Sequence, residues 1–417
     1  MSDGQYPDGL PMRLIISFAA LFSSILLLQL GFGGVVPLDA LSGTQIGFSP
    51  QQIGMLGSAH FLGFFVGCWW APRLMGEVGH SRAFAAFTAA GTISILSHMM
   101  FADPYAWAVM RMASGMAVAG CYTIIEAWMQ SKVTNANRGR AMGVYRIVDI
   151  TGNLGAQLLI AVLSPAMYFS YNLLALIACA ALFPMLLTRA APPKTGEAPR
   201  LRPKLAWEKS PLGAAGVVVA GVTGAAFRMV GPIYGIAVGL EANRIALFLA
   251  AFVLGGAVAQ FPIGWLADKF DRRSVLIGIS GAAIVACGAM AVSTQGNIVT
   301  IFLAAGFFGF TTFPIFSIST AHAHDFAEQH ERIELSAAHM FLFAVGAIAS
   351  PVIASALIAG FGPSAMFAFI ALAHLSLIVF GLMRSRARPA PESRTPYVYA
   401  PRTSFIIGRL LGRGRDR

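Results

Sequence analysis

The chain has 417 residues, of which 57% are hydrophobic and only 11% carry a charge. Soluble globular domains carry about 25% charged residues. A chain this poor in charge has too little polar surface to cover itself in water, so the composition excludes an ordinary soluble domain and indicates a membrane protein. The formal net charge is +11. Most of the basic residues lie in predicted loops that mark the cytoplasmic face, so we expect no nucleic-acid partner.

The four cysteines each lie inside an apolar stretch, and none of them forms a CxxC pair. This pattern predicts neither a disulfide framework nor a metal site. We also expect no cofactor.

A bilayer core of about 30 Å is crossed by roughly 20 residues of helix. By this criterion the sequence predicts twelve spans, with the least clear division at Ser164-Pro165. In chain order they are Leu14–Leu38, Ile53–Arg73, Ala83–Phe101, Tyr105–Met129, Gly139–Leu163, Ala166–Leu187, Leu212–Leu240, Ala246–Leu266, Val275–Val292, Ile298–Ala321, Leu335–Ala359 and Pro363–Met383.

The loops between these spans alternate strongly in charge. With both termini in the cytoplasm, 25 Lys and Arg residues lie on the inner side and only Arg244 lies outside. The positive-inside rule sets orientation by this bias. We therefore expect a multi-pass protein of the bacterial inner membrane, with both termini cytoplasmic.

The longest hydrophilic interruption lies between the sixth and seventh spans and contains Pro192-Pro193 and Pro203. It divides the chain into an N-terminal six-helix bundle (1–188), a cytoplasmic linker (189–210), a C-terminal six-helix bundle (211–384) and a basic cytoplasmic tail (385–417). Paired six-span halves are the plan of one large transporter class. The tail is interpreted either as a solvated segment or as an interfacial segment held by anionic lipid headgroups.

The loop between the eighth and ninth spans carries a specific motif. It consists of Gly264, Asp268, Lys269, Asp271, Arg272 and Arg273 in the spacing Gly-x-x-x-Asp-Lys-x-Asp-Arg-Arg. This loop resembles the signature loop of the major facilitator superfamily, from which it departs by having Asp271 where glycine is usual. The copy after the second span is degraded, with Pro72 and Gly76 in the places of the glycine and the aspartate.

A second resemblance, to a poorly characterised bacterial branch of the same superfamily, is carried by Arg111-x-x-x-Gly115, Glu126-Ala127-Trp128 and Asn137-Arg138-Gly139-Arg140. The resemblance implies an all-α membrane fold of twelve helices in two pseudo-symmetric six-helix bundles. It further implies that helices 1, 4, 7 and 10 line a central cavity. The loop at Gly264, Asp268, Arg272 and Arg273 would close the cytoplasmic side, with Asp268 facing Arg138-Gly139-Arg140.

Ionisable residues inside predicted spans are functional candidates because each costs roughly 2.5–3.5 kcal/mol at a helix centre on insertion scales. Arg146 and Asp149 are three residues apart and share one helical face. Glu126 lies at a similar depth on the preceding helix. We expect a Glu126–Arg146–Asp149 cluster, interpreted either as a gate or proton-sensitive latch, or as a structural ion pair between two helices.

Arg228 lies in the middle of the seventh span and has no acidic residue within its own helix, and Arg111 lies in the outer half of the fourth span. If both face the cavity, they would attract an anionic group; the alternative is pairing with backbone carbonyls or snorkelling. The other polar candidates for substrate contact are Gln29, Tyr122, Tyr234 and Thr312.

The sequence contains no Gly-x-x-x-x-Gly-Lys-Ser/Thr loop for ATP. The acidic run Asp325, Glu328, Glu331 and Glu334 is spaced at threes, which predicts a solvated helical face rather than an enzyme's site. We therefore expect a secondary active transporter, not an enzyme, that moves an organic anion or polar metabolite. Its transport would be coupled to an ion gradient, and the resemblance to the superfamily favours H⁺ as the coupling ion. Drug efflux on the same fold and a transport-inactive sensor or scaffold are the alternatives. The expected partners are the small solute, the coupling ion and membrane lipids, and the expected state is a monomer.

Overall fold

The structure is a computed structural model that describes residues 10–132, 138–187, 202–293, 297–328 and 331–385. Throughout these ranges the regular elements are helices. The first half contains α1 (Leu10–Gln45), α2 (Pro50–Val78), α3 (His80–Ser97), the short 3₁₀ helix η2 (His98–Met100), α4 (Pro104–Lys132), α5 (Arg138–Ile160), α6 (Tyr168–Ala180) and α7 (Leu182–Leu187). The second contains α8 (Pro203–Lys209), α9 (Pro211–Ala237), α10 (Ala242–Lys269), α11 (Arg272–Val292), α12 (Ile298–Thr312), α13 (Pro314–His324), α14 (Arg332–Phe361) and α15 (Ala365–Ser385).

The chain crosses the membrane twelve times, as the sequence predicts. Eleven helical stretches within the described ranges are long and apolar enough to span a bilayer. The twelfth crossing is α5, which is less apolar because Arg146, Asp149, Asn153 and Gln157 recur along one face of it and line a cavity. A polar face is tolerated in a spanning helix when it points to the interior of the protein rather than to lipid.

Two crossings are broken helices. The tenth crossing ends one helix at Thr312 and begins the next at Pro314. Proline lacks a backbone N–H and clashes with the preceding turn, so it starts a helix more readily than it continues one. The sixth crossing is divided between α6 and α7 at Ala181.

The two halves repeat the same packing pattern. In the first half α2 packs against α4, α1 against α5, and α3 against α6; in the second, α10 packs against α12, α9 against α14, and α11 against α15. If the crossings are numbered from one to six within each half, the same three pairs of crossings are in contact in both halves. The α2–α4 pair is in backbone contact at Gly63, where a Cβ atom would lie 1.8 Å from the carbonyl oxygen of Met112. Small residues of this kind let membrane helices approach closely.

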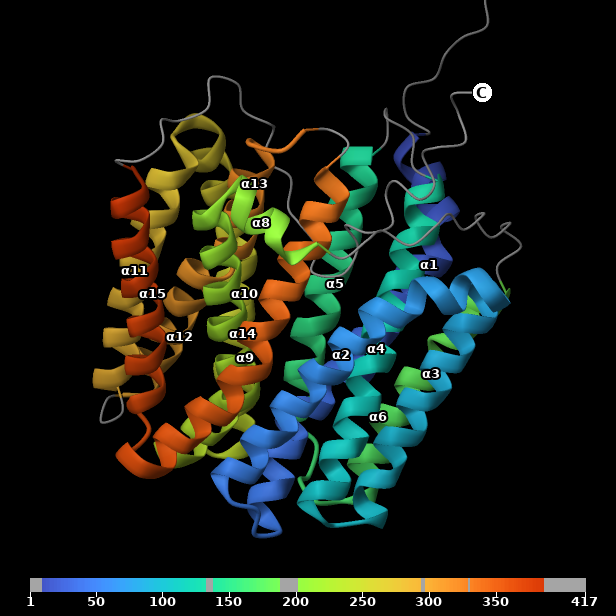
Figure 1. The fold of residues 1–417 in the computed structure, drawn as a ribbon. Coiled ribbons are helices and arrows are strands. Elements are labelled where there is room, and N and C mark those ends of the chain that lie inside the picture. The colour runs from blue at the N-terminus through green and yellow to red at the C-terminus, as the bar shows by residue number, and fades with distance from the viewer. Residues whose placement is uncertain (1–9, 133–137, 188–201, 294–296, 329–330, 386–417) are drawn as a thin grey trace, which may run out of the picture.

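The halves meet along α2 and α14 and along α5 and α10. Figure 1 shows that α2 and α14 converge at the end of the bundle away from α8, which we call the opposite end; the other is the α8 end. At the opposite end the contact is tight, since a Cβ atom on Gly54 would lie 2.0 Å from Ser355 Oγ. The structure is therefore closed between the two halves at the opposite end.

The acidic run before α14 differs from the expected solvated face. Glu331 pairs with Lys209 at 2.6 Å and Glu334 pairs with Arg202 at 3.0 Å, so two of these carboxylates hold the α8 segment against α14. Asp325 is buried beside Arg272, with 2.6 Å between Asp325 Oδ1 and the guanidinium. The spacing at threes was misleading because the run spans a helix end and a turn, rather than one continuous helix.

The α2–α4 contact predicts the effect of one added methyl group. Gly63→Ala should lower the melting temperature, because overpacking costs about 1–3 kcal/mol. Gly76→Ala is the matched control, since Gly76 lies in the same helix with no atom within 4 Å of an added Cβ. Thermal unfolding followed by tryptophan fluorescence in detergent distinguishes them. Equal melting temperatures for the two variants would contradict the close approach.

Candidate functional site

A cavity of about 200 Å³ lies between the two halves of the molecule. Pockets that bind drug-sized ligands have volumes of about 300–1,000 Å³, so this smaller cavity suits a small solute. Its walls come from α1, α2, α4 and α5 on one side and from α9, α10, α14 and Phe313 on the other. The predicted lining by crossings 1, 4, 7 and 10 is thus extended by crossings 2, 5, 8 and 11.

The wall from the first half is polar, and its centre is Asp149. The Asp149 carboxylate accepts hydrogen bonds from Gln29 Nε2 at 2.6 Å and from the Tyr122 hydroxyl at 3.0 Å. Arg146 donates to the other carboxylate oxygen at 2.6 Å. The charge is therefore held by partners from α1, α4 and α5. Gln29 and Tyr122, both predicted as substrate contacts, line the cavity.

Glu126 lies in the same wall and is fully buried. Its carboxylate accepts a hydrogen bond from the Tyr145 hydroxyl of α5. The structure thus brings Glu126, Arg146 and Asp149 to one wall of one cavity, as the spacing predicted. Their role in gating or coupling stays a prediction.

The wall from the second half is mainly aromatic, with one cation. Arg228 lines the cavity, and its guanidinium carbon lies 5.5 Å from the centre of the Phe313 ring. The other rings on this side are Phe227, Phe252 and Phe343. Such rings offer flat apolar surface, and a cation over a ring face is stabilised by the ring quadrupole.

Charges are balanced across the cavity. The polar wall carries Glu126, Asp149 and Arg146, and the aromatic wall carries Arg228. With carboxylates counted as anions, arginines as cations and histidine as neutral, the first wall has one net negative charge and the second one positive charge. The cavity as a whole is therefore neutral but polarised from one half of the protein to the other.

Three predicted contact residues lie elsewhere. Arg111 is outside the cavity lining and forms an ion pair with Asp39 of α1, with 3.4 Å between Arg111 Nε and Asp39 Oδ2, so it does not face the cavity as the hypothesis required. Tyr234 packs in the second half and donates its hydroxyl hydrogen to the Met290 carbonyl at 2.8 Å. Thr312 donates to the Phe308 carbonyl at 2.7 Å. Each hydroxyl is satisfied by backbone at or near a helix end.

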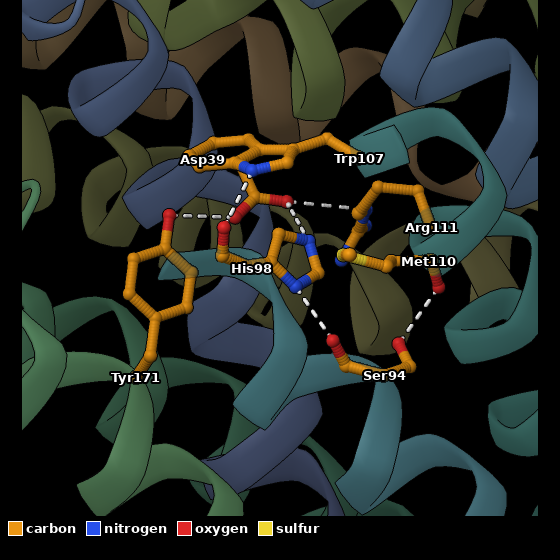
Figure 2. A network of polar contacts seen from close by, with 7 residues as sticks. All are labelled: Asp39, Ser94, His98, Trp107, Met110, Arg111 and Tyr171. Atoms are coloured by element: carbon orange, nitrogen blue, oxygen red, sulfur yellow. Dashed lines mark hydrogen bonds and ion pairs between the residues drawn. The ribbon is translucent and has the colours of Figure 1, made fainter. Parts of the chain in front are cut away.

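Arg111 belongs to a buried polar network that the sequence reasoning missed (Figure 2). Asp39 accepts a hydrogen bond from the Tyr171 hydroxyl at 2.9 Å, and its second oxygen lies 3.3 Å from His98 Nε2. The indole of Trp107 donates to the His98 carbonyl at 2.7 Å. Asp39, His98 and Arg111 are each at most 2% exposed. The network ties together α1, η2, α4 and α6.

Asp39 was missed because of a predicted span boundary. The first span was ended at Leu38, whereas α1 continues to Gln45 and carries Asp39 inside the protein. A signal was available in the sequence, because Val35-Val36-Pro37-Leu38 runs into Asp39 without a turn motif. An acidic residue at the edge of an apolar run is ambiguous between a loop and a buried partner.

The Gly264–Arg273 motif joins α10 to α11. Asp271, which stands where the resemblance expects glycine, is the N-cap of α11 and accepts a hydrogen bond from the Arg273 backbone N–H at 3.0 Å. Its φ of −61° makes glycine unnecessary at this position. Arg272 is buried, contacts Asp325, and donates to the Ala321 carbonyl at 3.0 Å.

Asp268 is 52% exposed and lies 3.5 Å from Arg272. Its predicted partners, Arg138 and Arg140, have side chains outside the described residues. The motif therefore anchors the start of α11 to the end of α13, and its contact with the first half stays a prediction.

Comparison with known proteins gives consistent matches. A family model described as the Major Facilitator Superfamily matches residues 15–219 and residues 213–414. The chain is 26% identical over 375 residues to a protein of Escherichia coli (strain 536) named as an uncharacterised MFS-type transporter, YcaD, covering 89% of this chain and 96% of that protein. A Salmonella heidelberg protein of the same name is 25% identical over 376 residues, with the same coverage.

Solved structures with the same fold include the nucleoside transporter NupG, with a TM-score of 0.70 and 13% identity over 89% of this chain and 98% of that one. The D-xylose-proton symporter has a TM-score of 0.68 and 13% identity, and the match covers 92% of this chain and 99% of that one. A bacterial homologue of the human lysosomal transporter Spinster, in an inward-facing and unoccupied conformation, has a TM-score of 0.68 and 14% identity. This match covers 98% of this chain and 99% of that one. At these identities the likeness shows the fold alone.

The buried pair between Arg272 and Asp325 predicts non-additive mutations. Arg272→Leu should destabilise the protein by about 3–5 kcal/mol, because it leaves the buried Asp325 carboxylate without its guanidinium. Arg272→Leu combined with Asp325→Leu should regain most of this loss. The measurement is thermal unfolding of both single variants and the double variant. Additive losses would show that the two side chains do not act as a pair.

Proposed function

Since the chain belongs to the major facilitator superfamily, we propose that it is a secondary active transporter that moves a small polar solute across the bacterial inner membrane by alternating access. The observation that carries this proposal is the cavity between the halves, which has ionisable side chains on both walls. In related folds two bundles rock about a site near the bilayer midplane. A cavity built from both bundles changes its exposure when they rock.

The orientation follows from the loop charges. The loops predicted to be cytoplasmic hold 25 Lys and Arg residues and include the α8 segment and the turn between α10 and α11, so in this proposal the α8 end faces the cytoplasm and the closed opposite end faces the periplasm. The structure then represents a state closed to the periplasm.

The proposed solute has no net charge. It carries hydrogen-bond acceptors at one end and hydrogen-bond donors at the other. An acceptor group or carboxylate would bind Arg228. Hydroxyl or ammonium groups would face Glu126 and Asp149, and a flat apolar surface would lie against the phenylalanine rings. A purely anionic solute would meet Arg228 but also the net negative wall opposite. The charge balance therefore favours a neutral or zwitterionic polar metabolite over the organic anion expected from the two arginines.

Coupling to a proton gradient is the proposed source of energy. Related folds include a protein named as a D-xylose-proton symporter. In this proposal Gly264, Asp268, Arg272 and Arg273 stabilise the state in which the α8 end is closed. Arg146 with Asp149, and Glu126 with Tyr145, change partners when solute enters. Buried groups that exchange partners in this way give the two states different affinities for solute, which alternating access requires.

A matched series of solutes tests the charge argument. Phenylalanine is zwitterionic, 3-phenylpropionate is its anionic fragment and 2-phenylethylamine its cationic fragment, while uridine is a neutral heterocyclic solute. We expect phenylalanine or uridine to raise the melting temperature of the purified protein more than either charged fragment. A ligand at 100 times its Kd stabilises by about 2.7 kcal/mol.

Arg228→Gln should weaken this binding at least ten-fold, whereas Arg82→Gln, at an exposed position, should leave it unchanged. A response to 3-phenylpropionate equal to that of phenylalanine, or one that survives Arg228→Gln, would overturn the proposed solute class.

A further inference from the structure

In the Asp39 network, the side chains of Asp39 and His98 are placed to share one proton. His98 Nδ1 lies 2.7 Å from the Ser94 carbonyl oxygen. A carbonyl oxygen can only accept, so Nδ1 carries a hydrogen. In neutral histidine the other ring nitrogen then bears a lone pair. That nitrogen, Nε2, faces Asp39 Oδ2 at 3.3 Å.

Two atoms with lone pairs would therefore face each other in a buried site. Among the described residues, neither Asp39 Oδ2 nor His98 Nε2 has a hydrogen-bond partner. Both side chains are at most 2% exposed. Leaving buried polar atoms unsatisfied costs about 1–3 kcal/mol each, and more for charged groups. One proton between these atoms serves both, either as an imidazolium beside a carboxylate or as a neutral ring beside a carboxylic acid.

The surroundings of the pair keep water out and hold it in place. The His98 ring stacks on Tyr171 at 5.3 Å between ring centres and meets Trp107 edge-on at 5.1 Å. The ionisable groups that face Asp39 are His98 from η2, Arg111 from α4 and Tyr171 from α6. With the proton bound, the Asp39 charge is shared between Arg111 and His98. Without the proton, Arg111 is its one cationic partner among the described residues.

The network is connected to the cavity through two helices. α1 carries Asp39 and also Gln29 and Pro37, which line the cavity; α4 carries Arg111 and also Tyr122 and Glu126, which line it too. A change in the attraction between Asp39 and Arg111 therefore acts on the same two helices that hold the cavity wall. Secondary-structure elements that have two arrangements can carry coupling between two sites in this way.

We propose that Asp39 and His98 form the proton-binding site of this protein, and that proton binding there favours the state closed at the opposite end. The proton passes from periplasmic water to the pair, and no other bond breaks. Arg111 is a positioning residue whose hold on Asp39 strengthens when the proton leaves. Proton binding stands on the geometry alone, whereas its effect on the conformation rests on the proposed alternating access.

The first test is ¹⁵N NMR of histidine-labelled protein in lipid nanodiscs at pH 7. The His98 signals are identified by their loss in His98→Gln. We expect hydrogen at Nδ1 and a shared or transferred proton at Nε2 in the wild type, and a neutral ring with bare Nε2 in Asp39→Asn. A wild-type ring with bare Nε2, or with a bare Nδ1, would overturn the proton site.

The second test reads the conformation without any solute. Ser355 is buried in the opposite-end contact, and Gln51 at the same end is exposed. The variants Ser355→Cys and Gln51→Cys are each labelled with a membrane-impermeant maleimide. The labelling rate of Ser355→Cys divided by that of Gln51→Cys reports opening of this end, because the division removes the pH dependence of thiol reactivity. The native cysteines are replaced by alanine.

We expect the ratio to fall several-fold from pH 8 to pH 5.5. Asp39→Asn should give the low ratio at both pH values, while Asp103→Asn, at an exposed helix start, should behave as wild type. A ratio independent of pH in the wild type, or a wild-type pH dependence in Asp39→Asn, would overturn the coupling role. Neither result depends on whether the solute class is correct.

Discussion

A charged side chain inside a lipid-embedded protein must find its partners within the protein, and much of this structure follows from that constraint. Asp39 is held by residues from three other elements, and Asp149 by residues from α1, α4 and α5. Arg272 and Asp325 join the start of α11 to the end of α13. Each cluster fixes several helices relative to one another, because breaking it would leave a charge in a medium that cannot solvate it.

The two halves share a packing plan but differ in chemistry. The first half contributes a hydrogen-bonded polar wall to the cavity and contains the Asp39 network, whereas the second contributes aromatic rings and Arg228. Solute contacts to the polar wall are directional, and contacts to the rings are not. In this account the first half senses the proton and binds the donor groups of the solute, while the second half supplies Arg228 and an apolar surface against the solute.

The fold was largely predictable from sequence because its signals are strong. Apolar runs of bilayer length set the number of crossings, and Pro314 marked a real break in the tenth. Arg146 and Asp149 were correctly paired because i, i+3 spacing places residues on one helical face. Arg111 could not be paired, since its partner Asp39 is 72 positions away and depends on which faces of α1 and α4 meet. The same applies to Tyr234, whose hydroxyl is satisfied by a carbonyl in another helix.

The most direct test of alternating access measures both ends of the molecule at once. Spin labels at Gln51 and Phe361 report the opposite end, and labels at Glu77 and Lys269 report the α8 end; all four positions are exposed. Electron–electron distances are recorded at pH 5.5 and 8, with and without uridine or phenylalanine. The account predicts that when one distance lengthens, the other shortens. Two distances that lengthen together, or that stay fixed under every condition, would contradict it.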